Sequence, residues 1–233
     1  MNELTVIFFS CRRLHLLYQS VKAFIESNTY PFVDFIIVND SGDEKIQKEI
    51  VNTYPGATVT LNAKNEGLMK SIDIGYAQVK TEYFAHFEDD WCCNGKKGFI
   101  EQAMAIMESN PKIEEVWFAD YNGHPLEEKI HLTNDQPLVT GYRLAKENYQ
   151  KGLNGFNDFA WHGFTTACAL KRLSDYKKVG PYADIPWQGT IWHREQAIGE
   201  RYHQLGYRTA CLIDEYVYNI GYGQSEYITG LER

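Results

Sequence analysis

Three acidic residues end an apolar run in the segment FAHFEDDWCCNG, residues 84–95. Glu88, Asp89 and Asp90 place like charges next to one another, and such charges repel and resist losing their water. The spacing Glu88-x-Asp90 puts two carboxylates on one side of an extended chain, and carboxylate oxygens are the ligands that Mg²⁺ and Mn²⁺ prefer. We therefore expect a metal ion or a basic side chain beside them, or plain water if they form a solvated turn.

The elements that position these acids alternate between apolar strands and amphipathic helices. Buried strands are predicted at 4–9, 33–38, 57–61, 82–87 and 114–120, and helices at 14–25, 43–54, 68–79 and 99–111. Alternation of this kind is typical of βαβ units and a mostly parallel sheet. The predicted fold class is therefore α/β.

Polar residues follow the predicted strands at the points where the strands end. Ser10, Asp40, the loop 65–67 and the acids 88–90 all occupy such positions. Because crossovers between parallel strands are right-handed, the carboxyl ends of the strands share one edge, and ligands of open α/β sheets bind there. The sequence thus predicts a ligand crevice lined by these groups.

The second half of the chain has a weaker pattern. Residues 121–160 are polar, and we predict a long loop there with a short helix near 142–149. A strand is expected at 164–170, a helix at 190–206 with Gly206 as its carboxyl cap, and a further strand at 207–213. No clear linker interrupts the sequence, which predicts a single domain over residues 1–233.

Composition narrows the functional class. The net charge of −8 argues against bulk binding to nucleic acid or to anionic membranes. The five cysteines lack a CxxC pair, which argues against a disulfide framework and favours a reducing compartment. No apolar run approaches the roughly 20 residues of a membrane span, so we expect a soluble, cytoplasmic protein. The absence of GxGxxG, Walker and HExxH motifs disfavours dinucleotide dehydrogenases, P-loop enzymes and zinc proteases.

Five segments, in order, resemble the motifs of family 2 glycosyltransferases with the GT-A fold. They are IIVNDSGD (36–43), NEGLMKSIDIGYA (65–77), FEDDW (87–91), FTTACALKRLSDYKKVGPYAD (164–184) and HREQAIGERYHQLGYR (193–208). The resemblance implies a mostly parallel, Rossmann-like sheet flanked by helices, with an irregular acceptor-side half. Residues 1–120 would form the nucleotide-sugar half and residues 121–233 the acceptor half.

The same resemblance implies an inverting transfer from a nucleotide-diphosphate sugar, with UDP-sugar favoured, to a hydroxyl acceptor. Glu195 would be the general base. A divalent ion, Mn²⁺ or Mg²⁺, would be held by Asp90, Glu88 and Asn219. The nucleotide-sugar would contact Ser10, Arg12, Asp40, Asn65, Gly67, Lys70, Glu88 and Asp89, and the acceptor would contact Trp161, His162, Gly163 and Trp187.

The chain departs from the family pattern at several positions. FFSCRR replaces the usual segment after the first strand, which bears on Ser10 and Arg12, and Lys70 is displaced from the usual basic position, where Ile72 stands. Glu88 stands where the family usually has Asp, Gln196 follows Glu195 where a second acid is common, and Asn219 stands where a late His often completes the metal shell. Two alternatives therefore stay open: a sugar nucleotidyltransferase, although FFSCRRLH lacks the glycines of its phosphate loop, and a catalytically silent nucleotide- or glycan-binding module. The sequence names neither the sugar, the acceptor class nor the oligomeric state.

Overall fold

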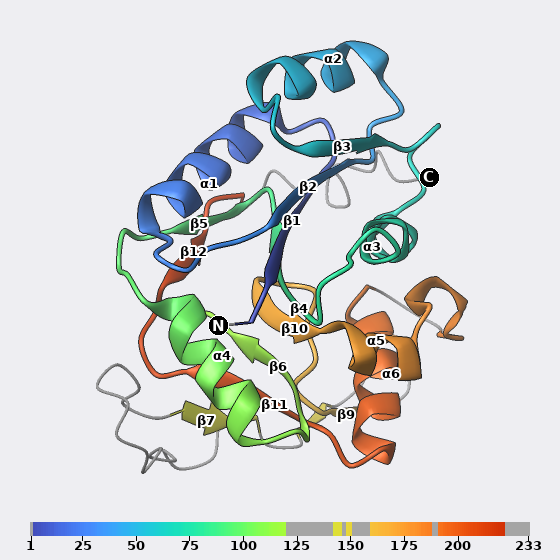
Figure 1. Cartoon of the computed structure of the whole chain (residues 1–233). Coiled ribbons are helices and arrows are strands. Elements are labelled where there is room, and N and C mark those ends of the chain that lie inside the picture. The colour runs from blue at the N-terminus through green and yellow to red at the C-terminus, as the bar shows by residue number, and fades with distance from the viewer. Residues whose placement is uncertain (1, 120–141, 146–147, 151–158, 188–190, 222–233) are drawn as a thin grey trace.

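The computed structural model describes residues 2–119, 142–145, 148–150, 159–187 and 191–221 (Figure 1). Its central sheet has eight strands in the order β3-β2-β1-β4-β10-β6-β11-β7. The strands are β1 (Leu4–Ser10), β2 (Asp34–Asn39), β3 (Thr58–Leu61), β4 (Tyr83–Glu88), β6 (Ile113–Trp117), β7 (Tyr142–Leu144), β10 (Ala169–Arg172) and β11 (Arg208–Leu212). Strands β1 to β4 run parallel, as do β6 and β11, whereas β10 and β7 are antiparallel to their neighbours. The predicted α/β class is confirmed.

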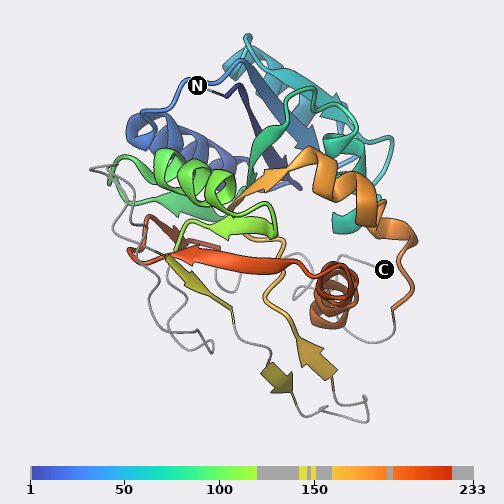
Figure 2. The same ribbon diagram turned by 60° about the horizontal axis from the view of Figure 1, so that its bottom comes forward.

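Helices cover both faces of this sheet (Figures 1 and 2). One face packs against α1 (Leu14–Ser27), α2 (Glu44–Thr53) and α4 (Phe99–Ser109). The other packs against α3 (Leu68–Tyr76), α5 (Leu173–Val179) and α6 (Ile191–Gln204). Burial on both faces explains why the strand β1 is buried at every position and reads as a continuous apolar run.

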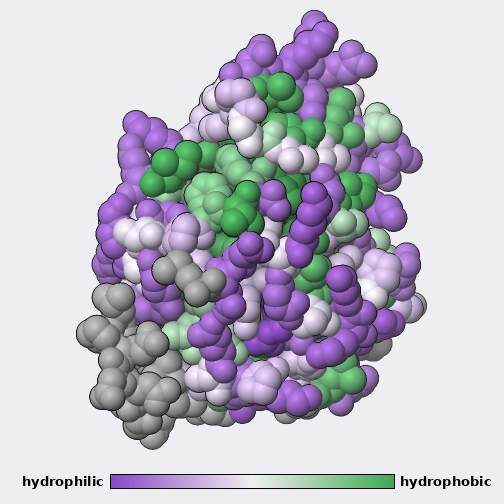
Figure 3. Space-filling model, viewed as in Figure 1, coloured by the Kyte–Doolittle hydropathy of each residue, from purple (hydrophilic) through white to green (hydrophobic). Residues whose placement is uncertain are grey.

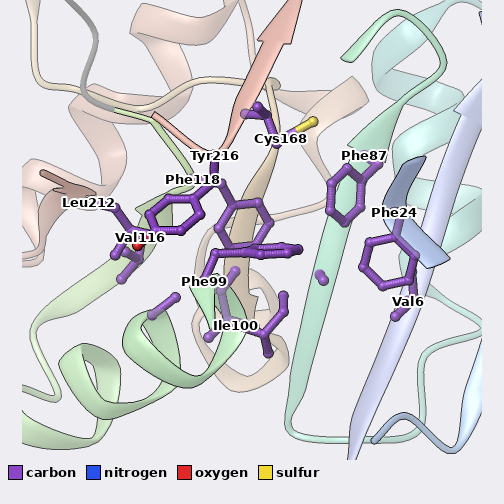
Figure 4. Close-up of a cluster of buried hydrophobic side chains, with 14 of the residues drawn as sticks. Val6, Phe24, Phe87, Phe99, Ile100, Val116, Phe118, Cys168, Leu212 and Tyr216 are labelled. Atoms are coloured by element: carbon purple, nitrogen blue, oxygen red, sulfur yellow. The ribbon is translucent and has the colours of Figure 1, made fainter. Parts of the chain in front are cut away.

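Aromatic side chains fill the first of these two interfaces (Figure 4). The ring of Phe87 stacks on that of Phe8 with centroids 4.9 Å apart, and Phe24 meets Phe87 edge-on at 5.1 Å. Phe99 of α4 meets Phe118 at 5.0 Å. This apolar layer holds α1 and α4 against the sheet and so helps to fix the positions of β1 and β4, whose carboxyl ends carry Ser10 and Glu88.

Short elements complete the fold around the strand ends. β5 (Trp91–Cys93) pairs with β12 (Val217–Asn219), and β8 (Asn148–Gln150) pairs with β9 (Phe159–Trp161). A 3₁₀ turn, η1, spans Tyr182–Asp184. Beyond β12, Ile220 N donates to the carbonyl of Asp90 at 2.7 Å. The chain near its carboxyl end therefore lies against the three acids.

Two predictions from the second half were wrong. The helix expected near 142–149 is replaced by β7 and β8, because residues 142–144 pair with the exposed edge of β11 and long-range pairing overrides local propensity. The strand expected at 164–170 begins only at Ala169, because Thr165 and Thr166 turn away toward acidic side chains. Most of the loop predicted at 121–160 lies outside the described residues.

Apolar residues gather around α1 and β2 on the face seen in Figure 3. The exposed apolar side chains of this region include Ile25, Phe32 and Val33.

Within the described ranges, no helix has both the length and the apolar character needed to cross a membrane.

Candidate active site

The carboxyl ends of three parallel strands bring the predicted polar clusters together. Ser10 lies opposite Asn39 and Phe9 opposite Glu88 in the strand register. The backbone continues these ladders past the strands: Asp40 N donates to the carbonyl of Ser10 at 2.8 Å, and Asp89 N to that of Phe9 at 2.9 Å. The acids and the Asp40 loop therefore share one edge of the sheet, where the sequence placed them.

Arg13, immediately before α1, supplies the positive charge beside the acids. Its Nη1 lies 3.1 Å from Asp90 Oδ2, and its Nη2 forms a short ion pair with Asp89 Oδ1. Ser10 Oγ donates to the other oxygen of Asp89 at 2.8 Å. The sequence analysis missed Arg13; the available signal was a pair of arginines directly after the first strand.

Burial disturbs the ionisation of these acids. The Asp89 side chain is 0% exposed, and burial raises its pKa to about 7 although Arg13 opposes the rise. Burial also raises the pKa of Glu88 well above its ordinary value, and the nearby charges of Asp90 and Glu195 raise it further. The charges of Asp90 and of Glu195 thus both act on the pKa of Glu88.

Two buried polar atoms at this edge have no hydrogen-bond partner within the described residues: Asp90 Oδ1 and Arg13 Nε. The first is a hydrogen-bond acceptor and the second a donor, so this edge retains one buried acceptor and one buried donor that no described residue satisfies. Glu88 and Asp90 offer hard oxygen atoms of the kind that Mg²⁺ and Mn²⁺ take. The described residues contain no group of three or more His, Cys, Asp or Glu side chains placed to hold a metal, so two carboxylates would need ligand oxygens or water to complete the shell.

Asp40 braces the loop that precedes α3. Its Oδ1 accepts from Asn62 Nδ2 at 2.6 Å and from Glu66 N at 2.8 Å, and its Oδ2 accepts from Gly67 N at 3.0 Å. Asn65 Oδ1 also accepts from Gly67 N, at 3.0 Å. Gly67, the residue before α3, has φ +80°. A positive φ of this kind favours glycine, although a Cβ at this position would meet open space. Asp40 therefore shapes the loop with both carboxylate oxygens.

Three further predicted residues lie at the surface. Arg12 is exposed with φ 61°, and its Nη2 lies 3.5 Å from the carbonyl of Ser41. Lys70 is exposed on α3. Asn219 is exposed on β12, and its Oδ1 accepts from Gly221 N at 2.9 Å. The proposed metal-binding oxygen of Asn219 is therefore engaged by its own turn.

Glu195 lies in the second turn of α6 with only 9% of its surface exposed. Its Oε1 accepts from Thr166 N and Thr166 Oγ1, both at 2.7 Å, and from Thr165 Oγ1 at 3.3 Å. Burial raises the pKa of Glu195, these hydrogen bonds oppose the rise, and the charge of Glu115 adds to it. Its second oxygen accepts no hydrogen bond from the described residues.

The predicted acceptor residues at 161–163 have contacts inside the protein. The ring of Trp161 packs on Trp117 with centroids 5.6 Å apart. His162 Nε2 lies 2.7 Å from a carboxylate oxygen of Glu200. Gly163 has φ +100°, and a Cβ there would lie 2.5 Å from Ala145 Cβ, so this glycine is required by packing.

Trp187 differs from those three because it lies beside the helix that carries Glu195. The guanidinium carbon of Arg194 lies 4.2 Å from the centroid of the Trp187 ring. A cation stacked on an aromatic ring stabilises both side chains. Of the four predicted acceptor residues, Trp187 therefore contacts Arg194, which directly precedes Glu195 in the sequence.

Comparisons with known proteins agree with this geometry. The family model described as glycosyl transferase family 2 matches residues 5–180, more than half of the chain. No curated protein matches the chain. Among solved structures, the chain resembles the mannosyltransferase PcManGT from Pyrobaculum calidifontis, solved in complex with GDP-Man and Mn²⁺, with a TM-score of 0.60 and 12% identity over 94% of this chain. It also resembles residues 1–349 of TarS from S. aureus, with a TM-score of 0.56 and 15% identity over 98% of this chain.

At this level of identity the structural likeness shows the fold alone. The chain spans 57% of the solved mannosyltransferase and 64% of the solved TarS fragment. The sheet order, the acids at the strand ends and the matched family model together lead to one assignment: the chain has the GT-A fold and belongs to glycosyltransferase family 2.

Proposed function

We propose that the chain, as one domain, transfers a sugar from a nucleotide-diphosphate sugar to an acceptor hydroxyl with inversion at the anomeric carbon. Residues 1–120 would bind the donor and residues 121–233 the acceptor. The observation that carries the proposal is Glu195, a buried carboxylate whose Oε1 accepts three hydrogen bonds, together with the acids at the end of β4. In the proposal the base and the acids border one substrate site, and the effect of the Glu195 charge on the pKa of Glu88 supports this.

The acid cluster fits a divalent metal. Asp90 and Glu88 would hold it, since Asp90 Oδ1 is a buried carboxylate oxygen without a hydrogen bond from the described residues and both side chains are hard oxygen donors. When bound, the metal would neutralise negative charge on the diphosphate leaving group. Arg13, whose buried Nε also lacks a partner there, would donate to the same diphosphate.

Glu195 would accept the proton of the attacking hydroxyl on its second oxygen. The acceptor oxygen forms a bond to the anomeric carbon as the bond from that carbon to the diphosphate oxygen breaks, and the nucleoside diphosphate departs. A single displacement of this kind inverts the configuration. Thr165 and Thr166 keep the carboxylate oriented for this step, because they occupy its other oxygen.

The proposal also concerns which nucleotide the sugar donor contains. The family resemblance favours UDP, whereas the similar mannosyltransferase was solved in complex with GDP-Man. The loop that Asp40 braces, with the backbone of Asn65 and Gly67, would form the wall against the nucleoside. Lys70, exposed on α3, would contribute a phosphate contact.

A Glu195→Gln variant tests the proposal, because it keeps the size and hydrogen-bond acceptor of the side chain and removes its basicity. The assay follows release of UDP or GDP from UDP-glucose, UDP-N-acetylglucosamine and GDP-mannose, with water or added sugars as acceptor. We expect kcat to fall by about 10²- to 10⁴-fold while donor binding is unchanged. Unchanged turnover would refute the role of Glu195, and binding without turnover in the wild type would leave a silent binding module.

A further inference from the structure

Glu195 is oriented by a short turn whose own backbone has no strand partner. Thr165 and Thr166 precede β10 and lie outside the sheet. Between them they supply every hydrogen bond that Glu195 Oε1 accepts from the described residues. A turn outside the sheet must find other partners for its backbone groups, so whatever holds Thr165 also sets the position of Glu195.

A buried ion pair on the neighbouring strands holds this turn. Glu115 of β6 and Lys171 of β10 lie opposite each other in the strand register and form a short ion pair. Glu115 Oε1 accepts from Thr165 N at 3.0 Å, and Lys171 Nζ donates to the Thr165 carbonyl at 3.2 Å. Both backbone groups of Thr165 are therefore satisfied by one pair of side chains.

The pair is itself rigidly placed. The side chains of Glu115 and Lys171 are 1% and 5% exposed. Trp117 Nε1 donates to the same Glu115 oxygen at 2.8 Å, and Lys171 Nζ lies 4.6 Å from the centroid of the Phe164 ring. Few rotamers are open to either side chain in such surroundings. The pair therefore holds Thr165 in one position, and the Thr165–Thr166 turn holds Glu195.

Stability alone gives no reason for charges at these two positions. Removing two charges from water is costly, and apolar side chains of similar size often replace a buried ion pair without loss of stability. What an apolar pair cannot do is accept a hydrogen bond from Thr165 N and donate one to its carbonyl. The function of the charges therefore lies in their contacts with the turn.

We propose that Glu115 and Lys171 are positioning residues for the catalytic base: they fix the Thr165–Thr166 turn, which in turn aims the carboxylate of Glu195. This inference rests on the proposed function for the role of Glu195 as a base. In this proposal the pair acts on the chemical step through Glu195.

The test compares three variants of the full chain. The double variant Glu115→Leu/Lys171→Met removes both contacts with Thr165 and leaves no unpaired charge. Glu115→Gln/Lys171→Met keeps an amide oxygen for Thr165 N and for Trp117, and so retains half of the support. Asp175→Asn is the matched control, because Asp175 forms a buried ion pair with Arg172, next in sequence to Lys171, without contact to the turn.

Two measurements separate positioning from stability: kcat and KM for donor hydrolysis, and the titration of Glu195 followed by ¹³C NMR of its carboxyl carbon. The Leu/Met variant should lower kcat by about 10- to 100-fold with KM for the donor unchanged. Its Glu195 pKa should lie above that of the Gln/Met variant, because both variants lose the Glu115 charge that raises this pKa and only the Leu/Met variant loses the ordered donors. The Gln/Met variant should recover much of kcat, and Asp175→Asn should leave kcat and the titration as in the wild type.

The inference is overturned if the Leu/Met variant has wild-type kcat and the same Glu195 titration as the Gln/Met variant, or if Asp175→Asn changes kcat and the titration as much as the Leu/Met variant does. If Glu195→Gln proves fully active, the proposed function fails, but the titration of Glu195 still decides whether the pair positions its carboxylate. If the Leu/Met variant does not fold, the Gln/Met variant decides through the same two measurements.

Discussion

Replacing Arg13 by methionine should destabilise the protein in a strongly pH-dependent way. Asp89 is buried completely, and its pKa is about 7 even with the guanidinium beside it. In the unfolded chain the ordinary value is near 3.9. Because Arg13 lowers the pKa of Asp89, its removal raises that pKa further.

The magnitude follows from proton linkage. The wild type itself loses stability as pH rises from about 4 to about 7, because the folded protein keeps a proton on Asp89 that the unfolded chain releases. The variant continues to lose stability above pH 7, at up to about 1.4 kcal/mol per pH unit. Between pH 7 and pH 8.5 this amounts to at most about 2 kcal/mol. Below pH 6 Asp89 is protonated in both proteins, and the substitution should cost only about 1 kcal/mol for lost hydrogen bonds.

Urea unfolding at pH 5.5 and pH 8.5 measures this difference. Arg12→Met is the matched control, because the same chemical change one residue earlier falls on an exposed side chain and should stay within about 0.5 kcal/mol at both pH values. An Arg13→Met cost that is equal at the two pH values, or larger at pH 5.5, would refute the coupling of Arg13 to Asp89.

Three further outcomes are expected. The acid limb of the kcat profile should lie above the ordinary glutamate pKa of about 4.3, because burial raises the pKa of Glu195; a limb at or below that value would contradict it. Gly221→Ala places a Cβ 2.4 Å from Asp90 Cβ and should weaken Mn²⁺-dependent nucleotide binding about tenfold by calorimetry, whereas Gly56→Ala, in open space, should not. Asp73→Ala removes the acceptor for Tyr182 N and Ala183 N and should lower the urea-unfolding free energy by about 2–4 kcal/mol; no change would mean that the η1 turn finds other partners.

The first half of the fold was predictable because each of its elements has a strong local signal. β1, β2 and β4 are apolar runs, and the helices between them have regular apolar spacing, so the shared strand edge and the position of Asp40 and Glu88 followed from topology. The acids stood out by their position directly after β4, whereas the role predicted for Glu195 came from the order of the family motifs, and no single motif would have sufficed.

The misses come from contacts between segments distant in sequence. Arg13 meets Asp89 and Asp90 only because β1 and β4 are neighbours, and nothing local distinguishes it from Arg12. The Glu115–Lys171 pair was hidden because a charged residue within a predicted strand indicates an exposed position. Gly163, predicted as an acceptor contact, also has a left-handed backbone and close packing against Ala145 that the sequence alone does not reveal.

The most direct test of the account is calorimetric titration of UDP and GDP into the wild type and Asp90→Asn, each with and without Mn²⁺. The account predicts that one nucleotide binds the wild type in a Mn²⁺-dependent manner and that Asp90→Asn loses the Mn²⁺-dependent part. Binding of neither nucleotide to the wild type under either condition, or Mn²⁺-dependent binding that Asp90→Asn retains in full, would contradict it.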